Sequence, residues 1–196
     1  QTIKPEIGAP GASLSAEAGT GTGNTPFGGT SGAAPMVSGA VALLLQKYPN
    51  YSPLRIKALL MNSAETNVYT NPALLPGELA PITRIGAGEL RVDRALALTS
   101  AAYSTLTQSA SLSFGAVDVA GPIEIRRNLT VENFSRTWKT FTVTPSFRFA
   151  NDEASGAVQV LTRSSLPVAP RGRSVLEVRM LIDPTKLPEW TLNGGS

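Results

Sequence analysis

Residues 28–47 read GGTSGAAPMVSGAVALLLQK and carry the most informative pattern in the chain. A serine, Ser31, follows two glycines where a tight turn leads into a helix predicted over residues 35–47, which ends before Pro49. Glycines let the backbone turn sharply and leave room beside it for another chain. Pro35 is expected in the first helical turn, where its missing N–H costs nothing. The first turn of a helix presents unpaired N–H groups and the positive end of the dipole. A negative charge developing on a carbonyl oxygen beside Ser31 would therefore be stabilised there.

The rest of the N-terminal half predicts further helices and loops. Ser52 is a good N-cap and Pro53 suits the first position of a second helix. The predicted helix over residues 35–47 is apolar on nearly every face, which is typical of a helix buried all round. The remaining expectations are a short strand at 3–10, loops at 15–29 and 67–81, and a turn or strand followed by a short helix at 90–98.

After about residue 101 the pattern changes to short segments with alternating apolar residues. Turn signals separate these segments, and this spacing is typical of an all-β sandwich. We therefore place a domain boundary near residue 101. The predicted strands cover residues 112–117, 123–131, 138–145, 158–161 and 175–182.

Composition excludes several classes of protein. The 196 residues carry a net charge of +3 with Lys and Arg scattered, which argues against a nucleic-acid partner or a membrane-surface patch. Without cysteine, disulfides and thiolate metal sites are excluded. No signal peptide is evident, and the longest apolar run, residues 40–45, is too short to span a bilayer. A chain that opens on Gln1 and closes on Asn-Gly-Gly-Ser reads as a fragment of a larger gene product.

The pattern Gly29-Thr30-Ser31-x-x-x-Pro35-x-x-x-Gly39 resembles the active-site serine signature of the subtilisin family. Three further segments resemble that family in the same order, at residues 4–11, 48–53 and 86–96. The resemblance implies that residues 1–101 are the C-terminal part of a doubly wound α/β peptidase domain. Met36 stands where the family usually has a histidine that is not the catalytic base, and Gly32 replaces a common methionine.

The same resemblance implies a role for the serine. Ser31 would be the nucleophile that attacks a peptide carbonyl of a protein or peptide substrate, giving an acyl-enzyme that water then hydrolyses. The backbone N–H of Ser31 would donate to the oxyanion, with Gly29 and Thr30 supporting the loop. The substrate-binding residues are unknown from this sequence, because the family builds those pockets largely upstream.

Two members of the family's catalytic triad lie outside this chain. In subtilases the order is Asp, His and then Ser, and this sequence contains no histidine. Lys47 would lie roughly 24 Å from Ser31 along the helix, and Lys4 is expected to be solvated, so neither replaces the histidine. We therefore expect the chain alone to be inactive, and its partner to be the missing N-terminal part of the peptidase domain. No cofactor is required and no metal ligands are evident; calcium in the parent protein is implied only by family analogy.

Residues 102–196 resemble the fibronectin type III-like domain that follows the catalytic domain in many large secreted bacterial subtilases. The resemblance rests mainly on the segments at 112–115, 129–133, 141–143 and 175–182. Any immunoglobulin-like β-sandwich would show a similar pattern. The domain is expected to be truncated before its last strand. The resemblance implies a secreted, extracellular or cell-surface protein of bacterial origin, with cell-surface contact through residues 102–196.

Three hypotheses about function remain open at this point. The chain is part of a serine endopeptidase, a non-enzymatic binding or spacer module, or one half of a pseudoprotease. The Ser31 signature in its four-segment context favours the first. Partner binding retained without residues 1–101 would favour the second, and a parent without the upstream Asp and His would favour the third.

Overall fold

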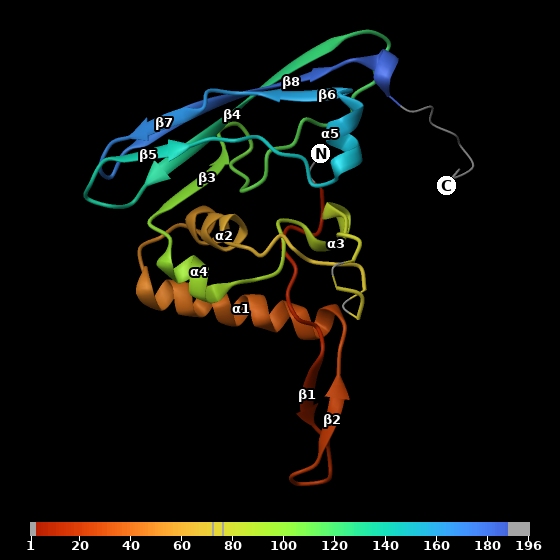
Figure 1. The fold of residues 1–196 in the computed structure, drawn as a ribbon. Coiled ribbons are helices and arrows are strands. Elements are labelled where there is room, and N and C mark those ends of the chain that lie inside the picture. The colour runs from red at the N-terminus through yellow and green to blue at the C-terminus, as the bar shows by residue number, and fades with distance from the viewer. Residues whose placement is uncertain (1–2, 72, 76, 188–196) are drawn as a thin grey trace.

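The computed structural model describes residues 3–71, 73–75 and 77–187. Its N-terminal half is mainly helical and its C-terminal half is mainly β (Figure 1). The first half contains β1 (Ser13–Ala16), β2 (Asn24–Phe27), α1 (Thr30–Lys47), α2 (Pro53–Asn62), α3 (Ile82–Ile85) and α4 (Val92–Ala97). The second contains β3 (Ser100–Ser104), β4 (Ile123–Asn133), β5 (Lys139–Thr142), α5 (Ala150–Ser155), β6 (Val158–Leu161), β7 (Ser165–Val168), β8 (Arg173–Ile182) and the 3₁₀ helix η1 (Pro184–Lys186).

The two long helices form, but α1 begins earlier than predicted and is exposed along much of its length, whereas its sequence predicted burial on every face. It starts at Thr30 rather than at residue 35, so Pro35 lies inside the helix and not in its first turn. The turn before it is made by Gly29, whose φ of 91° suits glycine. The cap of α2 is confirmed: the Ser52 hydroxyl accepts a hydrogen bond from the N–H of Arg55.

The helical half has its own apolar core, to which α1, α2, α4 and β3 contribute. Leu44 of α1 and Leu59 of α2 are fully buried at its centre. The core ends in a stacked pair of rings, Tyr48 and Tyr51, whose centroids lie 4.6 Å apart. The helices are therefore held together by burial on their mutually facing sides.

The β half is built from antiparallel pairs. A four-stranded sheet has the order β3-β4-β8-β6, and β5 pairs with β7 in a second, two-stranded sheet. Alternate residues of β7 and β8 are buried, as expected for strands that cover a core on one face. Residues from both sheets form this second core, which consists of Val131, Leu166, Val168, Leu176 and Val178.

Several strand predictions are confirmed and others are wrong. Strands form within or across the predicted segments 123–131, 138–145, 158–161 and 175–182. No strand forms at residues 112–117; Leu112 and Phe114 instead pack against the second core from an irregular segment. The alternating apolar pattern at residues 112–117 arises because these side chains pack against the core, although the segment forms no hydrogen-bonded strand pair.

Other elements escaped prediction. β7 contains Pro167, which cannot donate to a ladder and so obscures a strand that pairs on one side only. The predicted loop at 15–29 instead contains the β1–β2 hairpin, whose strands are exposed and therefore lack an apolar pattern. The predicted strand at 3–10 is reduced to isolated bridges at Ile7 and Gly8. The short helices α3 and α5 lie in segments for which the sequence predicted no helix.

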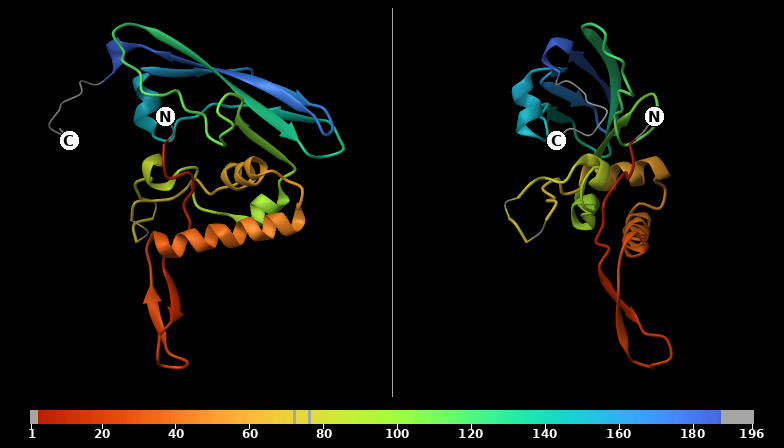
Figure 2. Two further views of the ribbon diagram at one scale, coloured as in Figure 1. Left: turned by 180° about the vertical axis from the view of Figure 1, so that it is seen from behind. Right: turned by 90° about the vertical axis from the view of Figure 1, so that its right-hand side faces the viewer.

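The two halves share a strand and several contacts. The predicted boundary near residue 101 falls inside β3, which pairs with β4 and also packs against the helical core. Figures 1 and 2 show the sheets lying across the helices, with the β1–β2 hairpin projecting away from the body beyond the start of α1. The described strand pairs are all antiparallel, so the chain is a mixed α/β structure in which no parallel sheet lies against α1. Within the described residues, no helix combines the length and apolarity that crossing a membrane requires.

Candidate active site

Ser31 is the second residue of α1 and is exposed. Its hydroxyl makes no hydrogen bond with any residue that the structure describes. The N–H groups of Gly32 and Ala33 donate to the carbonyl of Gly29 at 3.0 and 3.2 Å, whereas the N–H of Ser31 has no acceptor in the described chain. A free hydroxyl and a free N–H on one residue can, respectively, attack a carbonyl carbon and stabilise its oxygen.

A close approach of two backbone segments shapes the serine turn. A Cβ on Gly32 would lie 2.6 Å from the carbonyl oxygen of Gly11, and a Cβ on Gly11 would lie 2.7 Å from the oxygen of Gly29. Both distances are shorter than real side chains allow. Only glycine at these two positions lets the segment after Pro10 pack directly against the start of α1.

Two of the segments that resemble the family, residues 4–11 and 86–96, also lie side by side, although they come from opposite ends of the helical half. The N–H of Gly8 donates to the carbonyl of Gly88, and the N–H of Leu90 donates back to that of Gly8, both at 2.8 Å. Gly88 has a φ of 129° and Gly86 a φ of 60°, conformations that disfavour other residues. The fold therefore brings the residues around 4–11 next to both the serine turn and the segment at 86–96.

Gly29 and Thr30 lie where the sequence places them, immediately before Ser31, with Thr30 as the exposed first residue of α1. The two lysines considered as bases are engaged elsewhere. Lys47, at the other end of α1, donates to the carbonyl of Leu96 at 2.8 Å. Lys4 forms an ion pair with Glu6 at 2.9 Å. Neither contact directs an amine toward Ser31.

The described residues contain no group of three or more His, Cys, Asp or Glu side chains arranged to hold a metal ion. Three carboxylates of the helical half, on Glu6, Glu65 and Asp93, are instead paired with Lys or Arg side chains. Calcium binding thus stays an expectation about a longer protein, with no ligands assigned in this chain.

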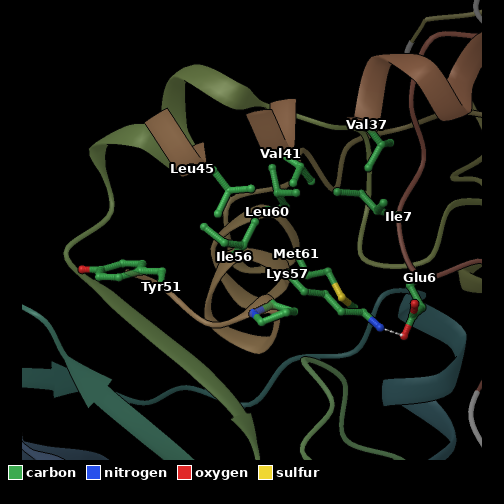
Figure 3. A pocket seen from close by; sticks show the side chains of 11 residues that line it. Glu6, Ile7, Val37, Val41, Leu45, Tyr51, Ile56, Lys57, Leu60 and Met61 are labelled. Carbon is green, nitrogen blue, oxygen red and sulfur yellow. Dashed lines mark hydrogen bonds and ion pairs between the residues drawn. The ribbon is translucent and has the colours of Figure 1, made fainter. Parts of the chain in front are cut away.

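Sequence reasoning missed an apolar groove beside the serine helix. A cavity of about 320 Å³ lies between α1, α2 and the segment at Glu6 and Ile7 (Figure 3). An ion pair between Glu6 and Lys57 stands at one end of it. Burial raises the pKa of Glu6, but the two lysines beside it outweigh burial and hold the pKa below its ordinary value. The apolar lining is contributed by Ile7, Val37, Val41, Leu45, Ile56, Leu60 and Met61.

Comparison with known proteins gives the class. Residues 1–104, just over half of the chain, match the model of the subtilase family, and the chain belongs to that family. The match covers Ser31 and all four segments described above.

The relatives are much longer than this chain. It is 31% identical to the minor extracellular protease Vpr of Bacillus subtilis (strain 168) over 190 residues, which cover 94% of this chain and 22% of Vpr. It is 45% identical to the subtilisin-like protease SBT3.16 of Arabidopsis thaliana over 71 residues, which cover 36% of this chain and 9% of SBT3.16. It is 58% identical to Fervidolysin of Fervidobacterium pennivorans over 38 residues, which cover 19% of this chain and 5% of Fervidolysin. The chain thus spans about a fifth or less of the length of these relatives.

Proposed function

We propose that this chain is the nucleophile-bearing part of a secreted subtilisin-like serine endopeptidase, which hydrolyses peptide bonds through an acyl-enzyme on Ser31. The observation that carries the proposal is the state of Ser31. Its hydroxyl and its N–H are both free and exposed at the start of α1, inside the family's serine signature.

The reaction assigns each group a task. The Oγ of Ser31 attacks the scissile carbonyl carbon, and the N–H of Ser31 donates to the oxygen as it becomes negative. A base must take the hydroxyl proton and pass it to the leaving amine, after which water hydrolyses the ester. Since the chain has no histidine, the His base and the Asp that orients it come from elsewhere in the parent protein. The chain alone is therefore inactive.

The architecture of the parent follows from the same proposal. Residues 1–101 complete a doubly wound α/β peptidase domain, and residues 102–196 form a fibronectin type III-like sandwich. Two antiparallel sheets sharing one core support the second assignment. The location is extracellular, as the name of the relative Vpr states for that protein. Protein or peptide substrates and calcium in the parent belong to this proposal too.

The missing N-terminal part of the peptidase domain is the partner that covers α1. The exposed fractions of Met36, Leu43 and Leu45 on this helix are 49, 48 and 40%. With the adjoining groove, these side chains leave apolar surface that water solvates poorly. The relatives contain the additional chain length that can cover this surface.

This uncovered surface predicts that the 196-residue chain associates with itself when its upstream partner is absent. Sedimentation velocity over a range of concentrations should show a rising mean mass, and a dye that fluoresces on apolar surfaces should bind. Replacing Leu43 with Glu should reduce both signals, whereas Arg163→Glu, on an exposed position of the β half, should leave them unchanged. A strictly monomeric chain that binds no dye would contradict the proposal.

Hydrolysis of a fluorescent casein by the parent protein tests the catalytic assignment. Ser31→Ala should lower kcat/KM by at least about 10³-fold. Ser38→Ala is the matched control, since Ser38 lies on the same helix but its hydroxyl bonds to the carbonyl of Ala34. Activity equal in the Ser31→Ala and unaltered proteins would exclude Ser31 as the nucleophile, and no activity in an intact parent that retains Asp and His would favour the pseudoprotease.

A further inference from the structure

Two turns lie side by side at one end of the β sheets and form what we call the tip: residues 134–138, between β4 and β5, and residues 169–172, between β7 and β8. The N–H of Arg171 donates to the carbonyl of Ser135, and the N–H of Asn133 donates to that of Gly172, both at 3.0 Å. The tip closes the left-hand end of the sheets in Figure 1, whereas the start of α1 lies toward the right.

The tip is held by one fully buried side chain. The amide nitrogen of Asn133 donates to the carbonyls of Thr137, Val168 and Ala169 at 2.8, 3.3 and 3.1 Å. Its amide oxygen accepts from the N–H and the hydroxyl of Ser135 at 3.0 and 2.7 Å. Because Asn133 links both turns, the side chains that the tip presents sit on an ordered backbone.

These side chains combine an aromatic ring with free cations. Trp138 is 69% exposed. Arg136 and Arg171 are exposed, and neither forms an ion pair or side-chain hydrogen bond with a described residue. The carboxylate at the base of the tip, Glu132, is already paired with two other arginines. The tip is therefore positively charged and has an apolar ring at its surface.

We propose that the tip attaches the protein to the surface of a bilayer that contains anionic phospholipid. Tryptophan prefers the interface between headgroups and acyl chains, where its apolar ring and its N–H are both satisfied. Guanidinium groups bind phosphate oxygens in a forked geometry, and each basic residue near an anionic surface adds to binding. A projecting, ordered turn can contact a broad surface such as a bilayer. An extended peptide would instead need a groove to bind in.

The position of the tip leaves the opposite end of the molecule accessible. Ser31 lies at the end of α1 that adjoins the β1–β2 hairpin, away from the tip (Figure 1). Attachment does not depend on the proposed protease function, so either proposal can fail without the other.

Flotation of the 196-residue chain with lipid vesicles tests the attachment. Vesicles of phosphatidylcholine and phosphatidylglycerol in equal parts should bind the chain, pure phosphatidylcholine vesicles should bind it far less, and added salt should weaken binding. The double variant Arg136→Ser, Arg171→Asn should lower the partition coefficient about 25-fold, and Trp138→Ser should lower it roughly tenfold or more. Asparagine suits position 171 because Arg171 has a φ of 56°.

The matched control is Arg163→Ser, which also removes an exposed positive charge from the β half. Arg163 precedes Ser165, at the end of the β5–β7 pair that lies farther from the tip. It should change binding by less than about twofold. In a Trp190→Phe background, the emission of Trp138 should shift to shorter wavelength on adding anionic vesicles.

Two results would overturn the proposal. One is failure of the folded chain to bind anionic vesicles at low salt. The other is binding that both tip variants retain in full, which would place the attachment on another surface such as the exposed side of α1.

Discussion

At the scale of single residues, Glu132 is a buried carboxylate that contacts two arginines and a tyrosine. Its side chain is 4% exposed and receives Arg55 at 2.5 Å and Arg173 at 3.0 Å, while the hydroxyl of Tyr103 lies 3.4 Å away. Arg55 belongs to α2, and Glu132 belongs to β4, so this ion pair joins the two halves of the molecule. A buried carboxylate is tolerated there only because both arginines neutralise it.

Replacing Glu132 with Gln should lower the free energy of unfolding by about 1–3 kcal/mol, because the partly exposed guanidinium groups of Arg55 and Arg173 lose a charged partner. Urea denaturation followed by circular dichroism measures this change. Glu124→Gln is the comparison: Glu124 pairs with Arg126 and Arg179 nearer the surface, and its loss should cost less than about 0.5 kcal/mol. Equal effects of the two substitutions would contradict the account of Glu132.

The same residue predicts a pH dependence. Burial raises the pKa of Glu132, but the hydrogen bonds from Arg55 and Arg173 outweigh it, so the pKa lies below its ordinary value of 4.5. The stabilisation is thus fully present above pH 4.5 and is lost as the pH falls through the lower folded-state pKa. The difference in stability between the unaltered chain and Glu132→Gln should shrink over that range, and a difference independent of pH would contradict this.

At the scale of elements, α1 shows what the sequence does and does not predict. Its existence, its end before Pro49 and its apolar character all follow from residues 35–47. Its start does not, since a proline and small residues usually mark the first turn or a loop. The helix starts at Thr30, where the backbone of Gly11, about twenty residues away in the chain, approaches Gly32 too closely to leave room for a side chain.

Two glycines on α1 should respond oppositely to substitution by alanine. Gly32→Ala should cost about 1–3 kcal/mol, since its Cβ would meet the oxygen of Gly11 at 2.6 Å. Gly39→Ala should stabilise the chain by about 0.5–1 kcal/mol, since a Cβ there meets nothing within 4 Å. Thermal denaturation of both variants gives the comparison, and destabilisation of similar size by both would refute the close approach.

At the scale of the whole molecule, the arrangement of the two halves lies beyond the sequence patterns. The patterns predict a helical half followed by a β half, and they predict β4, β5, β6 and β8 but not β1, β2, β3 or β7. They give no sign of long-range partners such as Arg55 and Glu132, which are 77 residues apart. The scattered Lys and Arg argued against a membrane-surface patch, and the proposed attachment of the tip departs from that expectation, because Arg136 and Arg171 gather only when the turns meet. At the candidate site, Ser31 follows from its signature, whereas the groove beside it appears only once α1 and α2 pack.

The contacts between the halves predict that the chain unfolds in one cooperative transition. Arg148 of the β half donates to the carbonyls of Ala80 and Thr66 at 2.7 Å and of Val68 at 3.2 Å in the helical half. Arg148→Met should therefore lower the midpoint of the single transition, because three backbone carbonyls lose a hydrogen-bond donor. Calorimetry that resolves two transitions in the unaltered chain would show that the halves fold independently.

The assignment of Ser31 as a nucleophile that depends on groups outside this chain is tested most directly by covalent labelling. The parent protein and the 196-residue chain are each treated with a fluorophosphonate, and the modified residue is located by mass spectrometry. We expect an adduct on Ser31 in the parent alone, absent from its Ser31→Ala variant and retained in Ser38→Ala. An adduct on Ser31 in the isolated chain would show that no histidine is needed, and an adduct on another serine of the parent would contradict the assignment.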